Sequence, residues 1–215
     1  PSSVSTIGDY FVSRCYSLTK IIIPSSVKEI GKLDFRSFTS LKELILPPKV
    51  HKIDERAFEN CTSLETFEIP SSVISLEKLA FCNCSSLKEI TIPPKVMKIN
   101  QFTFYNCISL IKVNIPSSVE FIDYNAFYGC KSLVEITIPP SVVSIGYNAF
   151  QHCTKLTKIE IPKSKNKLPK IVRKDESNNN LYKVLLVGSS NVGKTCIMYR
   201  YDKNQYKETF LATIG

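Results

Sequence analysis

The sequence predicts a repeat solenoid of the α/β class, built from 23-residue units with a parallel sheet on its concave face. An incomplete α/β segment with a phosphate-binding loop is expected to follow it. Three observations predict this arrangement: prolines at a constant spacing, apolar columns with the same step, and a glycine-containing motif near the end of the chain. With 215 residues and a hydrophobic content of 43%, the chain is long enough to bury a large core.

The prolines mark the repeat. They recur at every 23rd position, namely at Pro1, Pro24, Pro47, Pro70, Pro93, Pro116, Pro139 and Pro162. Valine and leucine columns keep the same step, and one unit reads P-x-x-V-x-x-I-x-x-x-A-F-x-x-C-x-x-L-x-x-I-x-I. A unit of this size cannot bury its apolar face alone, so its stability must come from stacking on its neighbours.

Each unit is expected to contain one strand and one short helical turn. The last three of residues 87–92 alternate apolar, polar and apolar, which is typical of a half-buried strand. Pro93 then ends the strand because it has no N–H for the ladder. The Ala126-Phe127 pair predicts the helical turn, with the phenylalanine in the core. The residue before the cysteine column, most often asparagine, fits a turn at positive φ.

This pattern resembles the BspA-type (bacterial-surface-antigen-like) leucine-rich repeat over residues 1–162. Leucine-rich repeats have periods of about 20 to 29 residues and supply a strand from each unit to a continuous sheet. The second unit departs from the pattern, with Asp34 in the alanine column and Phe38 in the cysteine column, although Phe35 is kept. The resemblance implies a curved slab with one broad concave face.

Strand side chains that point away from the core are expected to line that face. They are Lys20, Ile22, Glu43, Ile45, Thr66, Glu68, Glu89, Thr91, Lys112, Asn114, Glu135, Thr137, Lys158 and Glu160. The face mixes both signs of charge and has few aromatic residues, so it lacks the basic stripe of a nucleic-acid groove. A protein-binding face and a merely solvated surface both fit this composition.

Six of the eight cysteines fall in one column: Cys15, Cys61, Cys84, Cys107, Cys130 and Cys153. Phe38 occupies the same column, which favours packing over metal or redox chemistry. Cys82 and Cys84 form an isolated C-x-C pair without a second pair at metal-ligand spacing. His51 and His152 occupy variable positions, and neither is assigned a catalytic role. We expect a cytoplasmic location, where disulfides between coils do not form.

The positive charge belongs to the end of the chain. Residues 1–162 carry 17 basic and 15 acidic side chains, whereas residues 163–215 carry 11 and 4. Residues 163–180 are predicted to form a basic flexible linker, because the repeat pattern fails after Pro162. Contact of this linker with an anionic membrane is an alternative, but plain solvation is the favoured interpretation.

A phosphate-binding motif, G-x-x-x-x-G-K-[ST], follows the apolar run at residues 184–187. The candidate nucleotide-binding residues are Gly188, Ser189, Ser190, Asn191, Val192, Gly193, Lys194, Thr195 and Cys196. The glycines let the backbone bend around phosphate, Lys194 is expected to reach the β and γ phosphates, and the Thr195 hydroxyl is expected to ligate Mg²⁺. Residues 196–201 are expected to begin the following helix.

Residues 181–215 resemble the start of a Rab/Ras-like small GTPase, with a strand, the phosphate loop, a helix and the beginning of switch I. The resemblance implies binding of GTP or GDP with Mg²⁺ once the domain is complete, and it gives Thr213 a role at the metal. A Roco-type GTPase is an alternative, but the Ala-Thr-Ile-Gly ending at Gly215 favours the Rab-like interpretation. The D-x-x-G and N-K-x-D motifs of the family do not occur in these residues, so no catalytic residue is assigned.

Two functions remain open at this point. One is a protein-interaction scaffold coupled to a GTP-binding module in signalling or trafficking. The other is a structural or adhesion solenoid with a non-functional GTPase remnant. The oligomeric state is not predicted.

Overall fold

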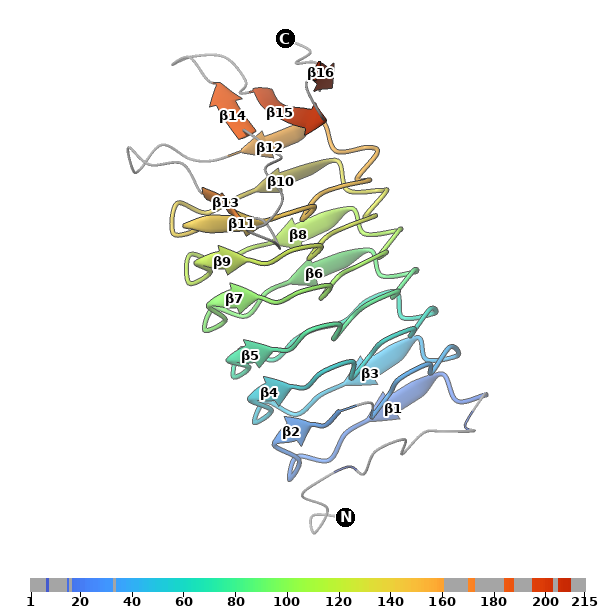
Figure 1. Cartoon of the computed structure of the whole chain (residues 1–215). Helices are drawn as coiled ribbons and strands as arrows, with labels where there is room; N and C mark the ends of the chain where they lie inside the picture. The colour runs from blue at the N-terminus through green and yellow to red at the C-terminus, as the bar shows by residue number, and fades with distance from the viewer. Residues whose placement is uncertain are drawn as a thin grey trace.

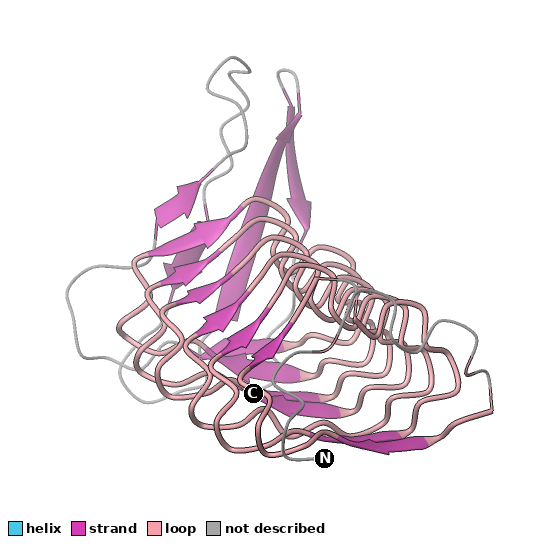
Figure 2. Ribbon diagram, turned by 90° about the horizontal axis from the view of Figure 1, so that it is seen from below, coloured by secondary structure: helices cyan, strands magenta, loops and turns pink. Residues whose placement is uncertain are grey.

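The computed structural model shows a stack of coils, each about one sequence repeat long (Figure 1). It describes residues 7, 15, 17–32 and 34–160 in full, and the backbone of 170–172, 184–187, 195–202 and 205–209. Each coil contributes a strand position to two separate rows, and loops connect the rows (Figure 2). The predicted parallel-sheet solenoid is therefore confirmed.

The first row contains the strands that the sequence predicts. They are β1 (Lys20–Ile22), β3 (Glu43–Ile45), β6 (Glu89–Thr91), β8 (Lys112–Asn114), β10 (Glu135–Thr137) and β12 (Lys158–Glu160). Paired strands run parallel with a register of one repeat, so that Ile90 lies opposite Val113. Between β3 and β6, Thr66 joins the row through a parallel bridge to Glu89. The constant register places the same repeat position at the same point of every coil.

The second row was not predicted. It consists of β2 (Glu29–Ile30), β4 (Lys52–Ile53), β5 (Ser75–Leu76), β7 (Lys98–Ile99), β9 (Phe121–Ile122), β11 (Ser144–Gly146) and β13 (Lys170–Val172). A turn precedes the strands, as where the Val27 N–H donates to the Pro24 carbonyl at 3.1 Å. Most of these strands are two residues long, so they leave no alternation that a sequence could reveal.

The helical turn expected at the Ala-Phe pair is absent, and no described residue is helical (Figure 2). Successive tight turns replace it, as where the Ala57 N–H donates to Asp54 and the Cys61 N–H donates to Phe58. Arg56 and Asn60 adopt positive φ values of 61° and 64°, which interrupt a right-handed helix. Their N–H groups instead bond carbonyls of the next coil.

Phenylalanines form the centre of the core. Adjacent rings stack at centroid separations of 5.2 to 5.5 Å, along the series Phe35, Phe58, Phe81, Phe104, Phe127 and Phe150. The valine, leucine and isoleucine columns are buried around them. Offset stacking adds about 0.5 to 1.5 kcal/mol per aromatic pair to the gain from burial. The predicted core position of the repeated phenylalanine is confirmed.

Two polar residues occupy the alanine column, and each bonds back within its own turn. The Asp34 carboxylate accepts a hydrogen bond from the Gly31 N–H at 2.6 Å. The Thr103 hydroxyl donates to the Asn100 carbonyl at 2.8 Å. Both side chains are buried, and these local bonds explain how the column accepts a polar group.

Part of the predicted linker is a strand. Residues 170–172 form β13, which pairs in parallel with β11 and places Ile171 opposite Ile145. The apolar pair Ile171-Val172 supplies a strand-forming sequence within the basic run. The second row therefore extends beyond residue 162.

The helix predicted from residue 196 is also absent. Thr195–Asp202 is strand β15, which pairs antiparallel with β14 (Val184–Val187) and with β16 (Gln205–Thr209). The described residues offer β14 no parallel neighbour, so its backbone groups pair with β15 instead. Within the described part of the chain, no helix has the length and apolar character needed to cross a bilayer.

Candidate functional site

The strand face is the outward surface of the first row, made by the fourteen side chains predicted above. Along each strand of this row a central apolar residue lies between two outward ones, as in Glu89, Ile90 and Thr91. Ile90 is buried, whereas its two neighbours are exposed. The predicted orientation of these side chains is confirmed.

Ion pairs between coils link charges on and beside the strand face. Lys20 Nζ lies 2.9 Å from a Glu43 carboxylate oxygen, and Lys88 Nζ lies 2.6 Å from Glu65. The hydrogen bond from Lys88 holds the pKa of Glu65 below its ordinary value. At the last coil, Lys158 Nζ contacts Glu160 at 2.8 Å, and that bond raises the lysine pKa. These pairs are exposed, so they set the pattern of charge more than the stability.

Exposed apolar side chains flank the charges. Ile22 and Ile45 lie on the strand face in the first described coils and are 65% and 43% exposed. Ile111 and Val134, which directly precede β8 and β10, are 48% and 47% exposed. A surface with charges of both signs and separate apolar positions has the mixed composition of a protein interface.

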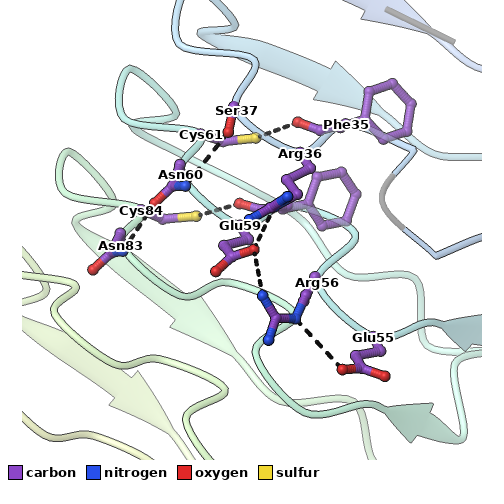
Figure 3. Close-up of polar contacts among 11 residues, drawn as sticks. Phe35, Arg36, Ser37, Glu55, Arg56, Glu59, Asn60, Cys61, Asn83 and Cys84 are labelled. Atoms are coloured by element: carbon purple, nitrogen blue, oxygen red, sulfur yellow. Dashed lines mark hydrogen bonds and ion pairs between the residues drawn. The ribbon is translucent and has the colours of Figure 1, made fainter. Parts of the chain in front are cut away.

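A second charged cluster lies on the turns that follow the second row of strands. We call these turns the turn side, and they comprise residues 31–37, 54–60, 77–83, 100–106, 123–129 and 146–152. The Glu59 carboxylate accepts from Arg36 Nε at 2.6 Å and from Arg56 Nη1 at 3.4 Å (Figure 3). Glu55 contacts Arg56, Lys32 and Lys78. Although burial opposes ionisation of Glu55, the two lysine charges hold its pKa below the ordinary value. The network is confined to the first three of these turns.

Cys15 is exposed, but the other five cysteines of the column are buried and make a repeated contact. Each thiol donates to the carbonyl of the phenylalanine in the preceding coil, as Cys61 does to Phe35 at 3.1 Å and Cys84 to Phe58 at 3.2 Å (Figure 3). Cys107, Cys130 and Cys153 repeat the contact. All described cysteines are free thiols. Burial raises the pKa of Cys61 to about 12, which leaves the thiol protonated and unreactive at neutral pH.

The described part of the chain holds no group of three or more histidine, cysteine, aspartate or glutamate side chains placed to bind a metal. Cys82 is buried on the turn side, and burial raises its pKa to about 12. His51 Nε2 lies 3.0 Å from a Glu29 carboxylate oxygen on the second row. These contacts have no arrangement that indicates acid–base or nucleophilic catalysis.

The structure places few of the predicted nucleotide-binding residues. The backbone of Thr195 and Cys196 lies in β15, where Thr195 is opposite Val187. The predicted site residues from Gly188 to Lys194, and Thr213, lie outside the described residues. The evidence for the phosphate loop is therefore the motif itself.

Comparison with known proteins identifies both parts of the chain. A family profile described as a BspA type leucine-rich repeat region matches six copies over residues 1–84 and 52–180. A Ras family profile matches residues 183–215. Thirty-five residues are 54% identical to the Ras-related protein Rab-10 of Caenorhabditis elegans and 49% identical to Rab-8A of Bos taurus. In each case the match covers 16% of this chain and 17% of the relative.

Solved structures of bacterial leucine-rich-repeat proteins resemble the solenoid. One from Bacteroides ovatus has a TM-score of 0.69 and 33% identity, covering 74% of this chain and 41% of its own. A leucine-rich cell surface protein from Faecalibacterium prausnitzii has a TM-score of 0.65 and 32% identity, and the match covers 98% of this chain and 50% of that protein. The leucine-rich-repeat protein of T. pallidum has a TM-score of 0.65 and 30% identity, covering 72% of each chain.

Proposed function

This chain belongs to the BspA type leucine-rich-repeat family, and on that premise we propose that its solenoid is a protein-binding scaffold coupled to a GTP-binding module in signalling or trafficking. The observation that carries the scaffold function is the strand face. It presents exposed charges of both signs and exposed isoleucines on a row of two-stranded parallel sheets that keep one repeat register.

The rigid register supports this function in physical terms. Side chains on a stacked sheet are held at fixed spacings, so a partner finds them preorganised and less entropy is lost on binding. Charged residues on such a surface select a partner by complementarity and accelerate encounter. Nucleic acid is not proposed as the partner, since the face lacks a basic stripe.

The test replaces Thr91 on the strand face by a photo-crosslinking amino acid. The variant is expressed in the cells from which the chain comes, and the cells are irradiated. The expected result is one defined crosslinked partner. Glu89 and Lys112 lie opposite each other on β6 and β8, so exchanging them through Glu89→Lys and Lys112→Glu keeps the net charge but inverts the pattern that the partner meets. This exchange should abolish the crosslink.

The matched control exchanges one charge of each sign among exposed residues away from the strand face, through Glu29→Lys with Lys49→Glu. This variant should still crosslink to the same partner. The strand face would not be the binding surface if the crosslink persisted after the Glu89 and Lys112 exchange. The same would follow if a probe at exposed Ser25 gave an equal crosslink.

The nucleotide part of the proposal is supported by the motif that ends at Thr195 and by the likeness to Rab proteins. In a complete domain, residues 188–196 would hold the phosphates of GTP or GDP, and Thr195 and Thr213 would ligate Mg²⁺. The chain covers 17% of these relatives, so GTP hydrolysis is not assigned to it.

A structural or adhesion solenoid with an inactive GTPase remnant is the second candidate. The likeness to the cell surface protein of Faecalibacterium prausnitzii favours it. The two candidates differ in location, because a GTP-binding module needs the cytoplasm and an adhesin needs the cell exterior. Treating intact cells with an added protease distinguishes them. If the solenoid survives, it lies inside the cell, which supports the first candidate; if it is cleaved, it lies outside, which supports the second.

A further inference from the structure

The centre of the strand face carries two charges that the chain itself does not neutralise. Glu89 on β6 and Lys112 on β8 lie opposite each other in the parallel register, and both side chains are exposed. Within the described part of the chain, neither forms an ion pair or a side-chain hydrogen bond. In the first described coils, by contrast, Lys20 pairs with Glu43 at 2.9 Å, and at the last coil Lys158 has two carboxylate partners. A partner can therefore bind the two central charges without breaking a contact within the chain.

Apolar side chains adjoin these charges at the start of the strands. Ile111 directly precedes Lys112 and is 48% exposed, and Val134 occupies the equivalent position of the next coil and is 47% exposed. The other end of the strands is polar, where Asn114 Nδ2 donates to Thr91 Oγ1 at 3.0 Å. The centre of the face therefore presents an acid and a base one coil apart, beside an apolar pair that is also one coil apart.

The step between coils decides which kind of segment can contact all of these positions. Hydrogen-bonded strands lie about 4.8 Å apart, and the core rings of successive coils have centroids 5.2 to 5.5 Å apart. One turn of an α-helix rises about 5.4 Å. A helix that lies across the strands therefore places one turn over each coil, and it drifts from this register by about 0.6 Å per coil or less.

An extended segment does not keep this register. Its side chains alternate between two faces, so those on one face are about 6.6 Å apart and drift by roughly 1 to 2 Å per coil. On a helix, residues three or four apart lie on the same side. One helix face can therefore supply a base, an acid one turn away and apolar neighbours, all at the step of the coils.

We propose that the partner of the strand face is an amphipathic α-helix, which lies along the stack of coils across β6, β8 and β10 (Figure 1). This inference rests on the proposed scaffold function and names the kind of partner that it takes. The helix carries a base over Glu89 and an acid one turn away over Lys112. Apolar residues of the same helix face cover Ile111 and Val134. The order of the two charges sets the direction of the helix, and the apolar contacts exclude water beside them.

The test places a photo-crosslinking amino acid at equivalent positions of three successive coils, Thr91, Asn114 and Thr137, each in a separate variant of the full chain. All three positions are exposed on the strand face. Mass spectrometry of the linked peptides identifies the residues of the partner that each probe reaches. A helix advances about 1.5 Å per residue, so the centre of the linked residues should shift by about 6 to 7 residues between the probes at Thr91 and Thr137. An extended partner would shift by only about 3 residues over the same two coils.

The possible outcomes separate this inference from the scaffold function. A shift of about 6 to 7 residues within one segment of the partner supports the helix. A shift of about 3 residues, or links scattered over separate segments, would overturn the helix while leaving a protein-binding face. If none of the three probes gave a specific crosslink, the scaffold function itself would fail, and this inference with it.

A second experiment tests the two charges of the helix. The chain with Glu89→Lys and Lys112→Glu should lose the crosslink, and exchanging the partner's own base and acid at the facing positions should restore it. The control chain with Glu29→Lys and Lys49→Glu should crosslink to the unchanged partner but not to the exchanged one. A partner exchange that failed to restore the crosslink would overturn the assigned charge pairing.

Discussion

The thiol of Cys107 donates a hydrogen bond to the carbonyl oxygen of Phe81 in the preceding coil at 3.2 Å, and the same oxygen accepts the Cys84 N–H at 3.2 Å. The cysteine column therefore does more than fill space, because each buried thiol joins two coils. The backbone bond remains if the thiol is lost, so the carbonyl of Phe81 stays paired.

The first prediction compares two substitutions of that thiol. Cys107→Ser should destabilise the fold by about 1 to 3 kcal/mol, because a hydroxyl is costly to bury and its shorter bond to carbon weakens its reach to Phe81. Cys107→Ala should cost less, since it leaves no polar group unpaired. Urea unfolding measures both, and a larger loss for alanine than for serine would show that the hydrogen bond dominates.

The second prediction concerns pH. Burial raises the pKa of the Cys61 thiol from 9.0 to about 12. Between these values the unfolded chain releases the proton while the folded chain keeps it, so unfolding becomes easier as pH rises. The contribution of Cys61 is intact below pH 9.0 and falls by about 1.4 kcal/mol per pH unit above it.

Cys61→Ala should therefore cost about 2 kcal/mol less near pH 10.5 than near pH 7.5, relative to the wild type. Denaturant unfolding at the two pH values measures the difference. Leu64→Ala provides the control, since it removes a buried side chain that does not titrate and should cost the same at both pH values. Equal costs of Cys61→Ala at both pH values would mean that the folded chain exposes this thiol to solvent.

The third prediction concerns the asparagine column. Gly129 has a φ of 72°, and a Cβ added there would collide with Asn106 Oδ1. Gly129→Ala should destabilise by about 1 to 3 kcal/mol through strain and collision. Gly129→Asn should cost less despite its greater size, because asparagine accepts this φ and Asn83 already bonds Asn60 in the same column at 2.8 Å. Thermal unfolding measures which of the two variants is less stable. An alanine variant as stable as the wild type would contradict the positive φ and the close contact found at Gly129.

The fourth prediction concerns the end of the solenoid. Residues 1–162 should unfold cooperatively on their own, because the repeat supplies most of the core within them. Residues 1–180 should be more stable by about 1 to 3 kcal/mol, since they add the backbone bonds of β13 to β11. Circular dichroism with urea compares the two. Equal stability would show that β13 contributes nothing to the fold.

Much of the solenoid could be predicted from the sequence because each repeat position has the same environment in every coil. Phe58, Cys61 and Leu64 could be assigned to the core from their columns alone. The second row could not, since two-residue strands leave no periodic pattern. The turns around Arg56 were mistaken for a helix because an Ala-Phe pair carries no sign of the positive φ that precedes it.

The strand face could be predicted residue by residue. Tyr105 and Tyr128 occupy the same position of successive 23-residue units, so the repeat also places them on adjacent coils, but only the structure shows that their rings stack with centroids 4.9 Å apart. The sequence also predicted a helix after the phosphate motif, where the structure has β15. That helix would depend on neighbouring strands and helices that the matched 35 residues do not include.

The most direct test of the proposed nucleotide module is the calorimetric titration of Mg²⁺-GTP. It should be applied to the 215-residue chain, to a chimera that continues this chain with the rest of a Rab domain, and to Lys194→Ala and Lys203→Ala variants of the chimera. The 215-residue chain should bind weakly or not at all, because β15 stands where a phosphate loop needs the start of a helix. In the chimera, Lys194→Ala should weaken binding on the order of 10- to 100-fold by removing the lysine charge that contacts the phosphates, while Lys203→Ala should leave it unchanged. Submicromolar binding by the 215 residues would contradict the claim that the module is incomplete in them, and unchanged affinity in Lys194→Ala would contradict the phosphate-loop assignment itself.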